Sequence, residues 1–160
     1  MLQQLLKTDT SALPFAHAAF QAHLSRFPST VNGLGIAEQT TLEMLHAGIN
    51  SPFELFDQVG NKLHVLGMGD LEYWHILRKM SQSPYPLLQI NGVKAIPAYN
   101  QPLSDSEVIL TEIGKNVMDG QVNRISGIGI DEWYGGVHLQ GDYPRWRWNS
   151  SLQTIVEVKR

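Results

Sequence analysis

Carboxylate, imidazole, indole and guanidinium side chains gather near the C-terminal end of the sequence, at Asp131, Glu132, Trp133, His138, Arg145 and Arg147. If this stretch forms strands, alternate residues share a face, so His138 lies opposite its apolar neighbours and the two arginines lie together. Such a cluster is suited to binding a small anionic ligand or a partner protein. The structural alternative is that Asp131 caps a turn, that His138 is a strand residue whose hydrogen bonds are made within the fold, and that the tryptophans belong to the core.

The sequence lacks the common catalytic motifs. It has no G-x-S-x-G, no H-E-x-x-H and no P-loop lysine, although triads also assemble from distant residues. Three G-x-G spacings occur, but a glutamate that would repel a pyrophosphate stands at the last position of G-x-G-x-x-G: Glu38, Glu72 and Glu132. Without cysteine there is no thiolate zinc site, and His17 and His23 fall on different helix faces. We expect no catalytic residues, metal or cofactor, which argues against an enzyme without excluding one.

A second cluster of polar residues lies on a predicted helix over 70–82 and a predicted hairpin after it: His75, Arg78, Lys79, Gln82 and Lys94. In a winged helix-turn-helix protein these positions would meet phosphates and base edges in the major groove. However, Asp70 and Glu72 open the helix and leave it neutral. The formal net charge of −3 also argues against a general nucleic-acid binder. DNA binding is therefore an alternative rather than the leading interpretation.

Composition indicates a folded protein of the cytoplasm. The chain has 160 residues, of which 42% are hydrophobic and 17% charged, enough for one sizeable domain or two small ones. Glycine and proline show no period, which excludes a collagen-like chain. The lack of cysteine fits a reducing compartment, and no apolar run reaches the roughly 18 residues of a membrane span.

Periodicity and capping signals predict five helices over the ranges 14–27, 36–47, 52–60, 70–82 and 111–120. The third begins with a capping box, Ser51 to Glu54, and is expected to break at Gly60-Asn61; Thr111 is the expected N-cap of the last. A hairpin is predicted from 87–90 and 93–96 through a type I′ turn at Asn91-Gly92, followed by a strand at 107–110. Four more strand-like runs predict an antiparallel meander, over 124–130, 136–140, 145–148 and 152–158.

The order of these elements between residues 36 and 120 is typical of a winged helix-turn-helix. We therefore predict an α+β protein with a leader at 1–12, a winged-helix-like part at 13–120 that includes an N-terminal helix, and a C-terminal β-meander at 121–160. The meander is expected to pack on the helices and to form one folding unit with them.

Three strings in the C-terminal half resemble the C-terminal region of an uncharacterised bacterial family of unknown function. They span residues 109–120, 129–139 and 146–149, and the middle one follows the pattern G-I-D-x-W-x-G-G-V-H-L. Upstream features similar to that family include Pro14-Phe15 and the stretch 66–70 followed by Trp74, so the similarity covers about residues 13 to 149. The resemblance implies one folding unit but no assigned activity, substrate or cofactor.

This sequence departs from the family pattern in two ways. In the family the region usually follows a small α/β domain, which this chain lacks, so we expect that domain to be missing or encoded separately. An acidic residue usually follows the second tryptophan of the last string, where Asn149 stands here. The resemblance therefore implies no acid–base role for position 149.

The leading prediction is a non-enzymatic cytoplasmic module that mediates regulatory or protein–protein contacts. The first alternative is a DNA-binding transcriptional regulator that uses helix 70–82 and the hairpin at 87–96. The second is an enzyme or a binder of a small anionic ligand around His138. The expected partner is a protein, which includes the separate α/β domain. DNA and a second copy docked on helix 14–27 are the other partners considered, and no membrane contact is expected.

Overall fold

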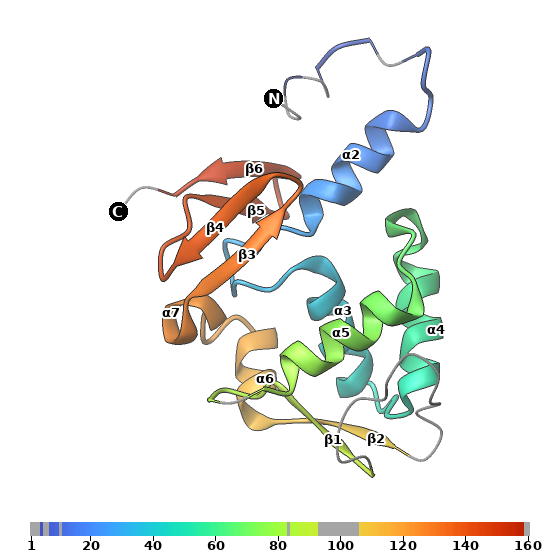
Figure 1. The fold of residues 1–160 in the computed structure, drawn as a ribbon, viewed down its shortest axis with the longest axis vertical. Coiled ribbons are helices and arrows are strands. Elements are labelled where there is room, and N and C mark those ends of the chain that lie inside the picture. The colour runs from blue at the N-terminus through green and yellow to red at the C-terminus, as the bar shows by residue number, and fades with distance from the viewer. Residues whose placement is uncertain (1–3, 5–6, 10, 83, 93–105, 159–160) are drawn as a thin grey trace. The chain divides into compact units, whose positions relative to one another are not determined.

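The computed structural model describes the chain apart from residues 1–3, 5–6, 10, 83, 93–105 and 159–160 (Figure 1). The fold is α+β, as predicted. The described helices are α2 (Ala16–Ser25), α3 (Ile36–His46), α4 (Pro52–Lys62), the 3₁₀ turn η1 (His64–Leu66), α5 (Asp70–Met80), α6 (Glu112–Met118) and α7 (Arg124–Ile128). The described strands are β1 (Leu88–Asn91), β2 (Glu107–Leu110), β3 (Ile130–Tyr134), β4 (Val137–Gly141), β5 (Trp146–Asn149) and β6 (Thr154–Glu157).

The chain divides into two compact units. One consists of Met1–Ile36 together with Asn123–Arg160, and the other is Ala37–Val122. The second unit contains nearly all of α3 and the elements from α4 to α6.

Helix α4 begins where the sequence predicts but ends later. Ser51 is its N-cap in extended conformation and Pro52 is its first residue, yet the Ser51 side chain makes no capping hydrogen bond, so the predicted capping box is not formed. The predicted break at Gly60-Asn61 is also wrong, because α4 continues to Lys62. Val59 is fully buried there and its carbonyl accepts from the Leu63 amide. Packing on this side outweighs the cost of a helical glycine, which is about 1 kcal/mol.

The strand after α5 finds a more distant partner than predicted. β1 pairs antiparallel with β2, with Leu88 opposite Leu110 and Asn91 opposite Glu107. Asn91 is thus a strand residue, and its φ is not positive as a type I′ turn requires, so the predicted turn is wrong. The predicted partner strand at 93–96 lies outside the described residues. Backbone hydrogen bonds from Val108 to Asn50 and from Thr111 to Leu87 hold β2 in this register.

The core of the unit Ala37–Val122 is built from buried residues of α3, α4, α5, α6 and the β1–β2 pair. Its fully or almost fully buried side chains are Leu42, Leu55, Val59, Tyr73, Leu77, Met80, Leu87, Leu88, Val108 and Val117. Thr111 caps α6 as predicted, because its hydroxyl accepts from the Gly114 amide at 2.9 Å and donates to the Pro86 carbonyl at 2.7 Å. Gly114 is required here, since a Cβ would overlap the carbonyl oxygen of Leu87.

The first run of the predicted C-terminal meander is a helix. Residues 124–128 form α7, whose N-cap is Asn123; its side chain accepts from the Ile125 amide at 3.1 Å. The Arg124 amide donates to the carbonyl of Asn32, and Ile125 is buried. This capping and burial override the β-propensity of the isoleucines, so the predicted strand over 124–130 is wrong except at its last residue.

The other three predicted runs form β4, β5 and β6, but the partner of β4 is β3, which was predicted as a strand only at its first residue. β3 and β4 make one antiparallel hairpin and β5 and β6 another, so the predicted continuous meander is not formed in the part of the chain described. Gly135 and Gly136 form the two-residue loop of the first hairpin, with φ values of 52° and 85° that are typical of a type I′ turn. Both hairpins pack with α2 around a cluster of Leu24, Phe27, Leu139 and Trp148.

Candidate functional site

The outer face of the β3–β4 hairpin carries the cluster that the sequence analysis singled out. In the register of the hairpin, Asp131 lies opposite Gln140 and Trp133 lies opposite His138. These four side chains are exposed, whereas the alternate residues Ile130, Tyr134, Val137 and Leu139 pack inward. Strand alternation therefore places an acid, an indole, an imidazole and an amide together on one face.

The members of this cluster contact one another closely. Nε2 of His138 lies 2.6 Å from Oδ1 of Asp131, and Nε2 of Gln140 donates to Oδ2 of Asp131 at 3.4 Å. The hydrogen bond from His138 lowers the pKa of the Asp131 carboxyl group. The His138 ring stacks on Trp133 with centroids 4.5 Å apart and an interplanar angle of 1°. Trp133 remains 69% exposed.

Glu132 and the two arginines lie elsewhere. Glu132 lies on the opposite face of β3 from Asp131 and Trp133, and its carboxylate accepts a hydrogen bond from the Tyr134 hydroxyl at 2.7 Å. Arg145 is exposed, forms an ion pair with Glu157 at 2.7 Å and covers the ring of Trp146. The structure therefore brings together Asp131, Trp133 and His138, while the contacts of Glu132 and Arg145 go to other residues.

Arg147 is a buried arginine, with 6% of its surface exposed. Its Nη1 donates to the carbonyl of Ser29 at 3.2 Å, and its Nε is buried without a hydrogen-bond partner. Burial lowers the pKa of this guanidinium group. Arg147 thus acts within the packing of the hairpin β5–β6 and the 28–34 turn, rather than with Asp131 and His138.

The cluster on β3–β4 is better suited to contact than to catalysis. Asp131 and His138 satisfy each other, which resembles the second and third members of a triad. The two residues lie on an exposed sheet face, and among the described residues no serine or threonine is seen to form a hydrogen bond with His138. Within the described ranges, no group of three or more His, Asp or Glu side chains is placed to hold a metal ion. Gln140 was missed by the sequence analysis, although it stands two residues after His138 in an alternating strand.

The predicted DNA-binding residues on α5 have different environments. His75, Arg78 and Gln82 are exposed, and their spacing puts them on one side of the helix and its extension. Lys79 instead forms an ion pair with Glu38 of α3 at 3.2 Å, and Glu38 is buried. Lys94 lies outside the described residues. One of the two cations of α5 is therefore already engaged inside the unit.

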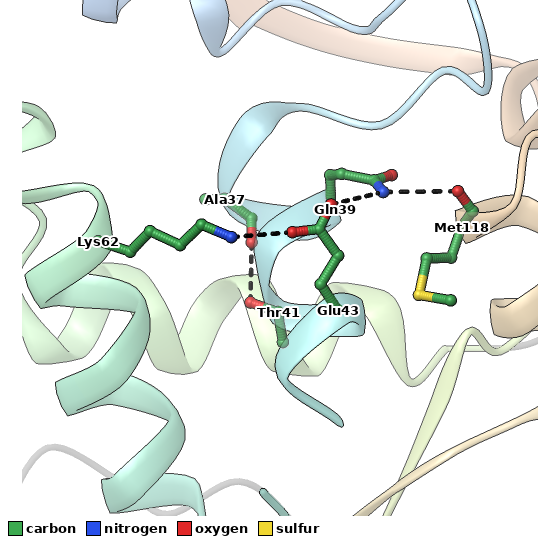
Figure 2. Close-up of polar contacts among 6 residues, drawn as sticks. All are labelled: Ala37, Gln39, Thr41, Glu43, Lys62 and Met118. Carbon is green, nitrogen blue, oxygen red and sulfur yellow. Dashed lines mark hydrogen bonds and ion pairs between the residues drawn. The ribbon is translucent and has the colours of Figure 1, made fainter. Parts of the chain in front are cut away.

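A network of polar side chains connects α3 with α4 and α6, and Lys62 forms part of it (Figure 2). Nζ of Lys62, at the end of α4, lies 3.0 Å from Oε2 of Glu43. Nε2 of Gln39 donates to Oε1 of Glu43 at 3.0 Å and to the carbonyl of Met118 at 3.4 Å. This network links α3 to α4 and α6, and in it Lys62 of α4 is paired with Glu43.

The unit Ala37–Val122 is acidic. It carries five Lys and Arg residues against ten Asp and Glu residues, which gives a formal charge of −5. The other unit carries seven against five, a formal charge of +2. The net charge of the whole chain, −3, therefore conceals a difference of sign between the two units.

An aromatic cluster joins α4 to α5. The ring centroid of Trp74 lies 5.7 Å from the ring centroids of Phe53, Phe56 and the buried Tyr73. Phe53 is 46% exposed, and Leu71, one turn before Trp74 on α5, is 47% exposed. We call Phe53, Leu71 and Trp74 the α4–α5 aromatic surface. Helical periodicity places these residues on apolar stripes, but it does not tell how deeply a stripe is buried.

Comparisons with protein-family models, with curated proteins and with solved structures find no match to this chain. Among the helices in the described part of the chain, none has the length and apolar content that a membrane span requires.

Proposed function

We propose that the unit Ala37–Val122 is a winged-helix-like module that contacts a protein rather than DNA. The order α3, α4, α5, β1, β2 supports the winged-helix comparison, with α5 at the position of the recognition helix and the β1–β2 pair at that of the wing. The long connection between the two strands includes residues 93–105, which the structure does not describe.

The observation that carries the proposal is the charge around α5. Asp70 and Glu72 occupy the first turn of this helix, the end that approaches base edges in helix-turn-helix proteins. Lys79 is paired with Glu38, and the unit as a whole has a formal charge of −5. DNA binders neutralise phosphates with clustered Lys and Arg, so this charge distribution disfavours DNA as the partner.

The surface beside α5 favours a protein partner. Aromatic side chains are enriched at the energetic centres of protein interfaces, and the α4–α5 aromatic surface exposes Phe53 and Leu71 around Trp74. DNA recognition would instead use the polar side of α5 that carries His75 and Arg78. The two alternatives therefore predict different interaction faces of the same helix.

A DNA titration tests the proposal directly. Fluorescence anisotropy of a labelled mixed-sequence duplex should show no binding at about 50 mM or about 200 mM salt, a range over which phosphate-driven affinity changes steeply. Tight binding at the lower salt that is lost in Arg78→Glu would overturn the proposal in favour of a DNA-binding regulator. Lys115→Glu, the same kind of charge reversal at an exposed position of α6, controls for a general loss of charge attraction.

Photo-cross-linking tests for a protein partner. A benzoylphenylalanine introduced at Leu71 should cross-link to a discrete protein in cells that express the chain. The same group at Ile113, an exposed apolar residue of α6, should give a different or weaker pattern. Cross-links that are mainly to nucleic acid, or identical at both positions, would contradict the proposal.

A further inference from the structure

We infer that the α4–α5 aromatic surface binds a basic, apolar segment of a protein partner. This inference rests on the proposed function and adds the location of the contact and the chemistry of the partner. The apolar part of this surface consists of Phe53, whose ring contacts the partly buried Trp74, and of Leu71, one helical turn before Trp74; Phe53 and Leu71 are each nearly half exposed. An indole held between aromatic neighbours is a rigid anchor, because contact with a partner then orders few additional rotamers.

Acidic side chains flank these apolar residues. Glu54 follows Phe53, Asp57 lies one turn further along α4 on the side of Phe53, and Asp70 precedes Leu71; all three are exposed. Asp70 accepts a hydrogen bond from the Leu71 amide at 2.8 Å, which holds its side chain beside Leu71 at the start of α5. The partner should therefore present apolar side chains together with cations.

The cation nearest in sequence to these acids does not neutralise them. Lys62 is the one Lys or Arg between Ser51 and Leu77, and it forms an ion pair with Glu43 of α3. The positive charges of a cationic partner would thus lie opposite the carboxylates of Glu54, Asp57 and Asp70. This charge complementarity steers association and disfavours acidic partners.

A separate partner fits this surface better than a second copy of the chain. The cations of a second copy would come mainly from the unit with a formal charge of +2. In that unit Arg147 is buried, and Arg145 is paired with Glu157. An amphipathic segment that carries lysines beside leucines supplies both the cations and the apolar side chains that this surface requires, as in helix-in-groove recognition.

The test uses the full-length protein and two synthetic peptides. One fluorescein-labelled 14-residue probe repeats Leu-Lys-Lys-Leu-Leu-Lys-Leu twice, and the other has glutamate at every lysine position. We expect the lysine probe to bind and the glutamate probe not to bind. Leu71→Glu and Asp57→Lys should each weaken the lysine probe about tenfold, since each removes one of the two required features. Both residues are exposed, and circular dichroism and melting of each variant verify the fold.

Matched variants separate this surface from general charge attraction. Ile113→Glu on α6 and Asp119→Lys at its C-cap make the same chemical changes at exposed positions, and each should change the affinity by less than about twofold. No binding of the lysine probe, or equal weakening by the α6 variants, would overturn the inference. It would also be overturned if sedimentation showed a dimer that Leu71→Glu dissociates, because a second copy would then occupy the surface.

The outcomes distinguish this inference from the proposed function. DNA binding through Arg78 would refute the proposed function whatever the peptides do. If neither DNA nor the lysine probe binds, only the inference about the α4–α5 aromatic surface fails, and the protein-contact function stands.

Discussion

Nε2 of His138 lies 2.6 Å from Oδ1 of Asp131 across the β3–β4 hairpin, and the same imidazole stacks on the ring of Trp133. A two-stranded hairpin has little stability by itself in water. The inner face of this hairpin is packed against the core cluster, so the contacts on the outer face add a second set of cross-strand interactions. The cluster therefore has a structural role whether or not it also binds a ligand.

The first prediction concerns the pH dependence of this contact. The hydrogen bond from His138 lowers the pKa of Asp131 in the folded state, so the contact stabilises the fold above the unfolded pKa of about 3.9. That contribution is lost as the pH falls through the folded pKa. In urea unfolding, the difference between wild type and Asp131→Asn should shrink as the pH falls below about 4.

A double-mutant cycle assigns the effect to the pair. In a His138→Ala background, Asp131→Asn should lose most of its dependence on acid pH, because the first and largest cause of the lowered pKa is gone. A difference that stays flat down to pH 3 in the wild-type background would contradict the assignment.

The second prediction concerns the buried hydroxyl pair of Thr41 and Tyr73, whose oxygens are 3.1 Å apart. Thr41 donates to the carbonyl of Ala37 at 2.8 Å, so Tyr73 is the donor to Thr41. Tyr73→Phe removes one hydrogen bond and should cost about 1 kcal/mol, whereas Thr41→Val leaves a buried tyrosine hydroxyl unpaired and should cost about 1 to 3 kcal/mol. Denaturant unfolding measures both, and the reverse order would contradict this bonding scheme.

The same tyrosine has a spectroscopic signature. Burial raises the pKa of Tyr73 above its ordinary value, since the phenolate would lose its hydration. In an ultraviolet titration to alkaline pH, one tyrosine should remain protonated until the protein unfolds, and this delayed fraction should be absent in Tyr73→Phe.

The third prediction compares two helical glycines. Gly114 of α6 lies against the backbone of Leu87, where a Cβ would overlap the carbonyl oxygen, while Gly60 of α4 has open space around it. Gly114→Ala should therefore destabilise the protein by about 1 to 3 kcal/mol, as overpacking does. Gly60→Ala should stabilise it by about 0.5 to 1 kcal/mol through helix propensity. Thermal melts that rank the two variants in the opposite order would show that α6 does not approach Leu87.

The fourth prediction concerns Arg147, whose Nε is buried without a hydrogen-bond partner. Because a buried cation loses its hydration, Arg147→Met should change the free energy of unfolding by less than about 1 kcal/mol or raise it. Trp148→Ala, the adjacent buried residue of the core cluster, should cost about 3 to 5 kcal/mol. A loss above about 3 kcal/mol in Arg147→Met would indicate instead that the guanidinium has a charged partner.

Local signals in the sequence predicted the helices well. Pro52 marks the start of α4, Thr111 caps α6, and Asp70 begins α5, each through interactions within one turn of the helix. The failures came from weighing such signals incorrectly. Asn123 is an N-cap visible in the sequence, but the isoleucines after it favoured a strand, and burial of Ile125 decided for the helix α7.

Strand pairing and the environment of each charged residue depended on longer-range contacts. The Asn91-Gly92 dipeptide is a strong local turn signal, yet β1 pairs with β2 because backbone bonds to Asn50 and Leu87 hold β2 in place. The string G-I-D-x-W-x-G-G-V-H-L corresponds to the β3–β4 hairpin, and its Gly-Gly pair forms the loop that sets the register. That register brings the side chains of Asp131 and His138 into contact.

By itself the sequence determined the α+β class, most helix positions and the alternation that turns His138 away from Val137 and Leu139, because capping and periodicity are properties of neighbouring residues. Only the tertiary structure decided that Arg147 is buried while Arg145 is exposed, and that Lys79 pairs with Glu38. It also decided that Phe53 and Leu71 stay at the surface. These outcomes depend on which distant segment covers each side chain, and a residue's own type and spacing carry no information about that partner.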